Sequence, residues 1–139
     1  MRWRRCGKSW IVRIDKGEEI VAALREFCKA HGIVLGAVSG IGATDKATIG
    51  CFKVKNKEYV KKELMGDHEI TGLTGNVSTM DGEVYLHLHI TLSDADYHTR
   101  GGHLNSAVVS GTCEVVIEEI EGQIEREYDD EVGLNLYKL

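Results

Sequence analysis

A stretch in the middle of the chain, Glu83–Ser93, alternates without a break between apolar and hydrogen-bonding residues. Its apolar positions are Val84, Leu86, Leu88, Ile90 and Leu92. Its polar positions are Tyr85, His87, His89, Thr91 and Ser93. Successive side chains of a β-strand point to opposite faces, so a period of two is typical of a strand and not of a helix. The stretch therefore predicts a strand with one face packed on a core.

A helical period occurs once, near the start of the chain. Its apolar residues are Ile20, Ala23, Leu24, Phe27 and Ala30. This spacing predicts an amphipathic helix over residues 18–31. Asp15 and Glu18 resemble a capping box at its start, with Asp15 as the N-cap, and Gly32 suits the left-handed position that follows a helix.

The rest of the chain consists of strand-like segments separated by turn residues. We expect strands at Ser9–Asp15, Ile33–Val38, Ala47–Val54, Lys57–Leu64, His68–Val77 and Ala107–Ile120. We expect a break at Ser39–Gly42, turns at Lys55–Asn56 and Met80–Gly82, and a polar loop at Asp94–Gly102. One helix and several strands with short connections predict an α+β fold with an antiparallel sheet.

Length and composition indicate one globular domain. The 139 residues are 42% apolar and 28% charged, which is enough for a single core. We expect that core in residues 9–120, and an acidic tail, residues 121–139, that packs on the core or on a neighbouring subunit. No apolar run approaches the roughly 18 residues of a membrane span, and the start lacks the apolar segment of a secretory signal. Four cysteines without C-x-x-C spacing then predict reduced thiols and a cytoplasmic location.

Three histidines form the candidate metal site. His87 and His89 lie two residues apart in the predicted strand, so their imidazoles share a face at a spacing of about 6.6 Å. His103 follows Gly101-Gly102, a flexible pair that lets the backbone return toward that strand. Imidazole suits zinc and its first-row neighbours, and three protein ligands leave one position for water or an anion. The alternative is a pair of half-exposed histidines on a solvated strand face.

Charge argues against one class of function. The formal net charge of −5 disfavours non-specific binding to duplex DNA, which needs a basic face. The one basic cluster comprises Arg2, Arg4, Arg5 and Lys8. This cluster could contact an anion or a nucleic acid. We expect instead that it is a solvated and poorly ordered terminus.

Four motifs occur in a fixed order between about Trp10 and Ile120. They are Gly17-Glu18-Glu19-Ile20-Val21-Ala22-Ala23-Leu24, Val38-Ser39-Gly40-Ile41-Gly42-Ala43, Leu86-His87-Leu88-His89 and Gly101-Gly102-His103-Leu104. Together they resemble the PPC domain (plants and prokaryotes conserved). The resemblance implies a compact, partly closed antiparallel sheet with one main helix, assembled as a homotrimer. It also implies a site for zinc or another divalent metal at His87, His89 and His103.

The resemblance leaves three functions open. The first is a metal-binding protein that holds a small anionic ligand or stabilises the trimer. The second is a metal-dependent enzyme acting on a small anionic substrate, because the related acetolactate decarboxylase fold has a comparable site. The third is a DNA-binding or transcription-linked protein, like the plant members. The chain has no proline and hence no AT-hook, and it carries Asp67-His68 where the family has Arg-Phe.

Further site candidates come from neighbouring residues. Glu69 could act as a general base or orient a ligand histidine, and Arg100 could hold an anionic substrate. The alternatives, which we favour, are an ordinary strand carboxylate and a surface arginine. Ser39, Gly40 and Gly42 resemble a tight loop near the site in this family, and are otherwise explained by turn chemistry.

Overall fold

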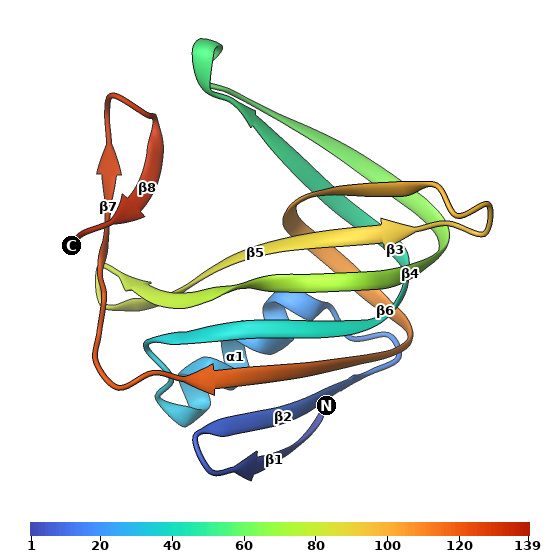
Figure 1. Ribbon diagram of the computed structural model, residues 1–139, viewed down its shortest axis with the longest axis horizontal. Helices are drawn as coiled ribbons and strands as arrows, with labels where there is room; N and C mark the ends of the chain where they lie inside the picture. The colour runs from blue at the N-terminus through green and yellow to red at the C-terminus, as the bar shows by residue number, and fades with distance from the viewer.

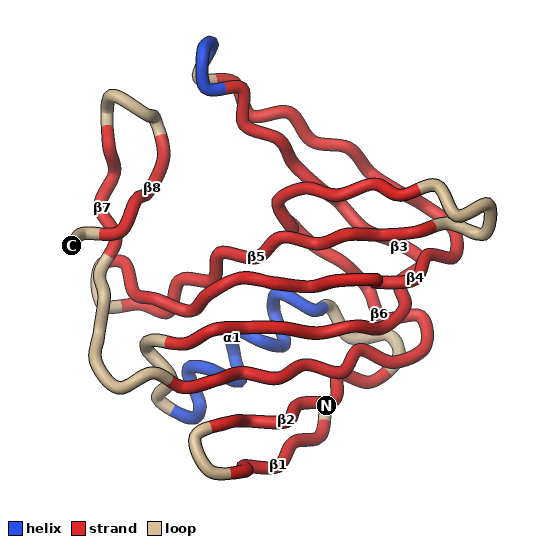
Figure 2. Tube along the Cα trace, in the orientation of Figure 1, coloured by secondary structure: helices blue, strands red, loops and turns tan.

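The computed structural model describes residues 1–139 and contains one α-helix and eight β-strands (Figures 1 and 2). The helix is α1 (Ile20–His31), and the strands are β1 (Arg2–Cys6), β2 (Ser9–Asp15), β3 (Gly36–Lys53), β4 (Glu58–Met80), β5 (Glu83–Ser93), β6 (Thr99–Glu119), β7 (Arg126–Asp129) and β8 (Leu134–Tyr137). The predicted strand at Glu83–Ser93 is confirmed as β5 with the same bounds.

Six strands form one antiparallel sheet in the order β1-β2-β6-β3-β4-β5. The first part of β6 also pairs with β5, so the sheet closes partly on itself. The remaining strands, β7 and β8, form a separate hairpin at the C-terminus. The predicted fold class, an α+β protein with a partly closed antiparallel sheet and one main helix, is thereby confirmed.

The core lies between α1 and the sheet, which the helix covers on one face (Figure 1). The helix buries Ile20, Leu24, Phe27 and Cys28. The apolar positions of β5 face the same core, and Leu88, Ile90 and Leu92 are fully buried. Each such side chain contributes on the order of 1.5–3 kcal/mol to folding, which explains why the alternation in β5 fixes its register.

The helix starts later than predicted. It begins at Ile20, and its N-cap is Glu19, whose carboxylate accepts hydrogen bonds from the backbone N–H groups of Val21 and Ala22. The Glu18 carboxylate does accept a hydrogen bond from the backbone N–H of Asp15, at 2.7 Å, but both residues precede the helix. Gly32 ends the helix with φ of 68°, as predicted.

Several predicted interruptions of the strands are wrong. The segment Ser39–Gly42 does not interrupt the strand. It lies within β3, where the pairing with β4 shifts its register between Gly40 and Gly42. A Cβ at Gly42 would collide with the carbonyl oxygen of Thr112 on β6, so this glycine allows a close strand approach and not a turn. Likewise β4 is one strand, and β6 begins at Thr99, inside the predicted loop.

The two ends of the chain are also ordered. The basic N-terminus forms β1, which pairs with β2, in place of the poorly ordered terminus that we expected. The outer parts of β3 and β4 form an arm that projects beyond the sheet, beside the β7–β8 hairpin (Figure 1). Lys57 at the tip of the arm donates a hydrogen bond to the carbonyl oxygen of Asp130, which joins the arm to the hairpin. The structure contains no helix with the length and hydrophobicity that crossing a bilayer requires.

Candidate metal centre

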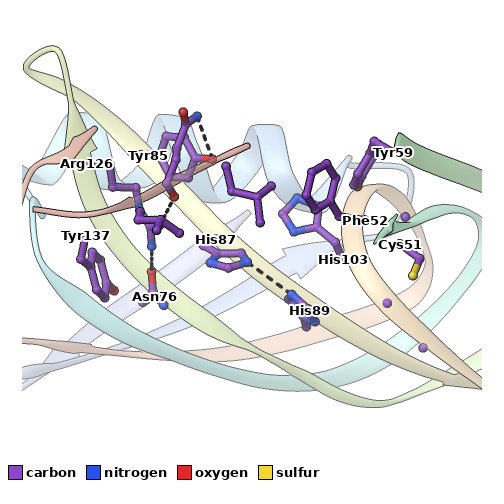
Figure 3. A pocket seen from close by; sticks show the side chains of 16 residues that line it. Cys51, Phe52, Tyr59, Asn76, Tyr85, His87, His89, His103, Arg126 and Tyr137 are labelled. Carbon is purple, nitrogen blue, oxygen red and sulfur yellow. Dashed lines mark hydrogen bonds between the residues drawn. The ribbon is translucent and has the colours of Figure 1, made fainter. Parts of the chain in front are cut away.

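The three predicted histidines meet on the outer side of the sheet, opposite the apolar face of β5. His87 and His89 come from β5, and His103 on β6 is the cross-strand partner of His89. Their rings face a common space (Figure 3), with ring centroids 5.2–5.6 Å apart. One ligand nitrogen from each ring lies within 4.8 Å of the others. The sequence spacing therefore produces a convergent set of three imidazoles.

The spacing of these nitrogens suits a tetrahedral ion. The Nε2 atoms of His87 and His89 are 3.3 Å apart. Bonds of about 2.0–2.1 Å from zinc to nitrogen, at tetrahedral angles, place two ligating nitrogens roughly 3.3–3.4 Å apart. The spacing of His87 and His89 thus fits a divalent transition metal, and the third ligand nitrogen, from His103, lies within 4.8 Å of both.

Glycines explain how His103 reaches the site. Gly101 and Gly102 lie inside β6, at the point where it pairs with both β5 and β3. A Cβ on Gly102 would lie 2.6 Å from the carbonyl oxygen of Gly50, and one on Gly101 would lie 3.0 Å from that of Ile90. The pair therefore permits close packing of three strands, and the expected flexible turn is absent.

The environment keeps two of the histidines neutral. Burial, followed by the charge of Arg126 and of the neighbouring histidines, lowers the pKa of His87 to about 4. Burial and the nearby His89 also lower the pKa of His103. A metal binds the neutral imidazole, so both side chains are in the ligating form at neutral pH.

The histidines form one wall of an open pocket of about 710 Å³ (Figure 3). Its lining comes from the arm, from the faces of β4, β5 and β6, and from the β7–β8 hairpin. Aromatic and aliphatic lining residues are Phe52, Tyr59, Tyr85, Leu134, Leu136 and Tyr137. None of the lining residues is an aspartate or a glutamate, and the only fully charged one is Arg126.

Arg126 is the functional candidate that the sequence did not reveal. It belongs to β7, in the acidic tail, and it is only 7% exposed. Its guanidinium lies between the rings of Tyr85 and Tyr137, and hydrogen bonds hold it to β4 and β8. A lone arginine in an acidic stretch carries no periodic signal, so only the fold identifies it.

The other predicted site residues lie elsewhere. Glu69 is exposed and lines a different surface hollow, next to His68. Arg100 is exposed and pairs with Asp94 at 3.2 Å. Neither lines the pocket of the three histidines, so the structure does not bring them to the candidate site.

The predicted ligand loop is part of a strand. Ser39, Gly40 and Gly42 lie within β3 and pair with β6 and β4. None of the three lines the histidine pocket. A second group, Asp94, Asp96 and His98, also offers three clustered ligand atoms, but it lies in an exposed loop.

The sequence of this chain matches a known domain over most of its length. Residues 1–121 match the Plants and Prokaryotes Conserved (PCC) domain. The chain is also 28% identical over 125 residues to the bifunctional protein GlmU of Synechococcus sp. (strain JA-3-3Ab). That match covers 88% of this chain but only 19% of GlmU, so the chain spans about a fifth of this curated relative.

Solved structures show the same fold. A "putative DNA binding protein" from Bacteroides thetaiotaomicron has 43% identity and a TM-score of 0.96, over 99% of this chain and 96% of that one. A metal-containing protein from Archaeoglobus fulgidus has 39% identity and a TM-score of 0.89, over 100% and 99%. Acetolactate decarboxylase from Bacillus subtilis shares the fold alone, at 15% identity and a TM-score of 0.55, over 84% and 54%. The chain belongs to the Plants and Prokaryotes Conserved (PCC) domain family.

Proposed function

We propose that this PCC-domain protein binds one divalent transition-metal ion through His87, His89 and His103, with zinc as the expected ion. The observation that carries the proposal is the convergence of three ligand nitrogens within 4.8 Å on the wall of an open pocket. The metal-containing relative from Archaeoglobus fulgidus supports it, since 39% of its residues are identical over the whole of this chain. Three histidines leave a fourth position free, which a ligand in the pocket that they line could occupy.

A small anionic ligand is the expected occupant of the fourth position. A bound ion of this kind supplies a Lewis acid that attracts and polarises an oxygen-bearing group. The chain's own contribution is a pocket whose size suits a small molecule and whose single formal charge is positive. We therefore place ligand binding, and not trimer stabilisation alone, at this centre.

A metal-dependent enzyme is the second candidate. The open pocket favours it, because a substrate can reach the metal centre from solvent. The lack of a carboxylate in the pocket weakens it, because Glu69, the candidate general base, lies in another hollow. Binding is thus better supported than catalysis.

Direct binding to DNA is less well supported. The relative from Bacteroides thetaiotaomicron is named for it, and exposed Arg2 and Arg4 on β1 offer some positive charge. Arg5 is already paired with Glu119 at 3.0 Å, and the net charge of the chain is −5. Duplex binding needs a continuous basic face, which these residues do not provide.

The expected assembly and location complete the proposal. The family resemblance and the projecting arm support a homotrimer. Four cysteines without a disulfide support a reducing compartment such as the cytoplasm, with two of the thiols, Cys6 and Cys51, exposed.

Elemental analysis tests the metal assignment. Protein purified without a His-tag or chelator should contain close to one zinc ion, or another divalent ion, per chain. His89→Ala should lower that content at least tenfold. His98→Ala, which removes an exposed loop histidine outside the centre, should leave it unchanged. A wild type without metal, or equal metal in His89→Ala, would show that the histidines are structural.

A further inference from the structure

Arg126 is a buried cation without a counter-ion. Its side chain is 7% exposed, and it takes part in none of the ion pairs of the structure. Burying a charge without a partner of opposite charge is costly, so such groups are usually paired or used. Here the cation lies on the wall of the pocket that contains the three histidines.

Neutral groups hold the guanidinium in place. Nε donates to Ser78 Oγ at 2.8 Å, and Nη2 donates to Asn76 Oδ1 at 2.9 Å. Nη1 donates to the carbonyl oxygen of Asn135 at 2.9 Å. The rings of Tyr85 and Tyr137 lie 4.9 and 4.3 Å from its central carbon. These contacts fix the position of the guanidinium, and the hydrogen bonds use three of its five N–H donors.

The two remaining N–H donors can serve a ligand. A guanidinium that is fixed in orientation presents a planar fork, which suits the two oxygens of a carboxylate. The rings of Tyr85 and Tyr137 favour a cation between them but supply no negative charge to balance it. The geometry therefore favours a site that is completed by an anion.

The rest of the pocket lining indicates the chemical nature of the remainder of that anion. Phe52 and Tyr59 from the arm and Leu134 and Leu136 from β8 provide apolar and aromatic walls. Arg126 is the only cationic side chain among the lining residues, so beside a bound metal ion the pocket offers one positive group and not the several that a phosphate dianion usually meets. A monocarboxylic acid with an apolar body fits this lining.

We propose that Arg126 anchors the carboxylate of a small organic acid whose apolar body lies in the pocket beside His87. This inference rests on the proposed function, because it names the class of ligand that the metal centre would meet. It also adds a binding residue from outside residues 1–121, the part that matches the domain family.

Binding of benzoate tests the proposal. The wild type, loaded with Co²⁺ so that the visible spectrum reports on the metal, is titrated with benzoate, and the metal-free protein is titrated by calorimetry. Arg126→Gln should weaken benzoate binding about 10- to 100-fold, the range expected for charge-assisted hydrogen bonds, while the protein still takes up one Co²⁺ ion per chain. The uncharged analogue benzamide should bind the wild type no better than benzoate binds Arg126→Gln.

A matched control separates the pocket cation from the net charge of the chain. Arg100→Gln removes an exposed arginine outside the pocket, so its benzoate affinity should stay within about threefold of the wild type. Arg126→Lys keeps the charge without the fork and should bind with intermediate affinity. An equal loss in Arg100→Gln and Arg126→Gln would overturn the anchor, because the effect would then follow the net charge of the chain and not the pocket.

The outcomes distinguish the two proposals. If Co²⁺ binds and benzoate binds Arg126→Gln as tightly as the wild type, the anchor is wrong and the metal centre stands. If no metal binds but benzoate still binds the metal-free wild type in an Arg126-dependent way, the anchor stands and the metal centre is wrong. If inorganic phosphate binds more tightly than benzoate at the same site, the carboxylate assignment is wrong.

Discussion

His87 is the site residue with the most strongly altered pKa. Burial and the charge of Arg126 lower it to about 4, whereas the ordinary value, expected in the unfolded chain, is about 6.5. As the pH falls through this interval, the unfolded chain takes up the proton before the folded one does. The stability that neutral His87 contributes is therefore complete above about pH 6.5 and is lost toward pH 4.

We expect this loss to depend on the imidazole itself. Urea denaturation of the metal-free protein at about pH 7.5 and pH 4.5 should show a larger fall in the free energy of unfolding for the wild type than for His87→Gln. His98→Gln, which alters an exposed loop histidine, should behave like the wild type. Equal losses in all three proteins would mean that other groups cause the pH dependence.

Residue type and spacing predicted the three histidines but could not predict Arg126. His87 and His89 share a face because a strand has a period of two, and this rule holds wherever the strand lies. Arg126 joins the pocket only because the tail folds back as a hairpin and packs on β4. No local pattern in the sequence encodes that contact, just as none showed that Glu69 and Arg100 lie outside the pocket.

At the scale of elements, the start of α1 is coupled to β6 through one side chain. Glu19 Oε1 accepts hydrogen bonds from the backbone N–H groups of Val21 and Ala107, both at 3.0 Å. Its Oε2 accepts one from Ala22 at 2.7 Å. A single carboxylate thus caps the helix and also satisfies a donor of the neighbouring strand.

Glu19→Ala should therefore destabilise the protein more than the loss of an ordinary cap. We expect a fall of about 1–3 kcal/mol in the free energy of unfolding, because the substitution leaves three donors without their acceptor. Glu26→Ala, in an exposed position on the same helix, should change it by less than about 0.5 kcal/mol. Urea denaturation at neutral pH measures both, and similar values for the two variants would contradict this role of Glu19.

Element types were easier to predict than element ends. The alternation in β5 and the helical period of α1 gave the type of each element correctly, and for β5 the alternation also coincides with its bounds. Glycines caused the main errors, because Gly40, Gly42 and the pair Gly101-Gly102 can indicate either a turn or a close approach of strands. In the structure they lie where β6 packs tightly on β3 and β5, which depends on contacts distant in sequence.

At the scale of the whole molecule, the tail leaves apolar side chains in solvent. Leu134 and Leu136 are each 36% exposed, and Leu139 is 98% exposed. The arm adds Val54 at its tip, which is 58% exposed. Apolar groups gathered on projecting segments are typical of surfaces that another subunit covers. This arrangement agrees with the proposed homotrimer, in which the tail would contact a neighbour.

Light scattering in solution tests the assembly. The wild type should have three times the mass of the 15.4 kDa chain. Leu136→Asp places a charge in the proposed contact and should shift the mass toward that of one chain, because burying an unpaired carboxylate is costly. Tyr97→Ser removes an exposed aromatic ring from the loop between β5 and β6, away from the tail, and should leave the trimer intact. A monomeric wild type would contradict the trimer, whereas a trimeric Leu136→Asp would place the interface away from the tail.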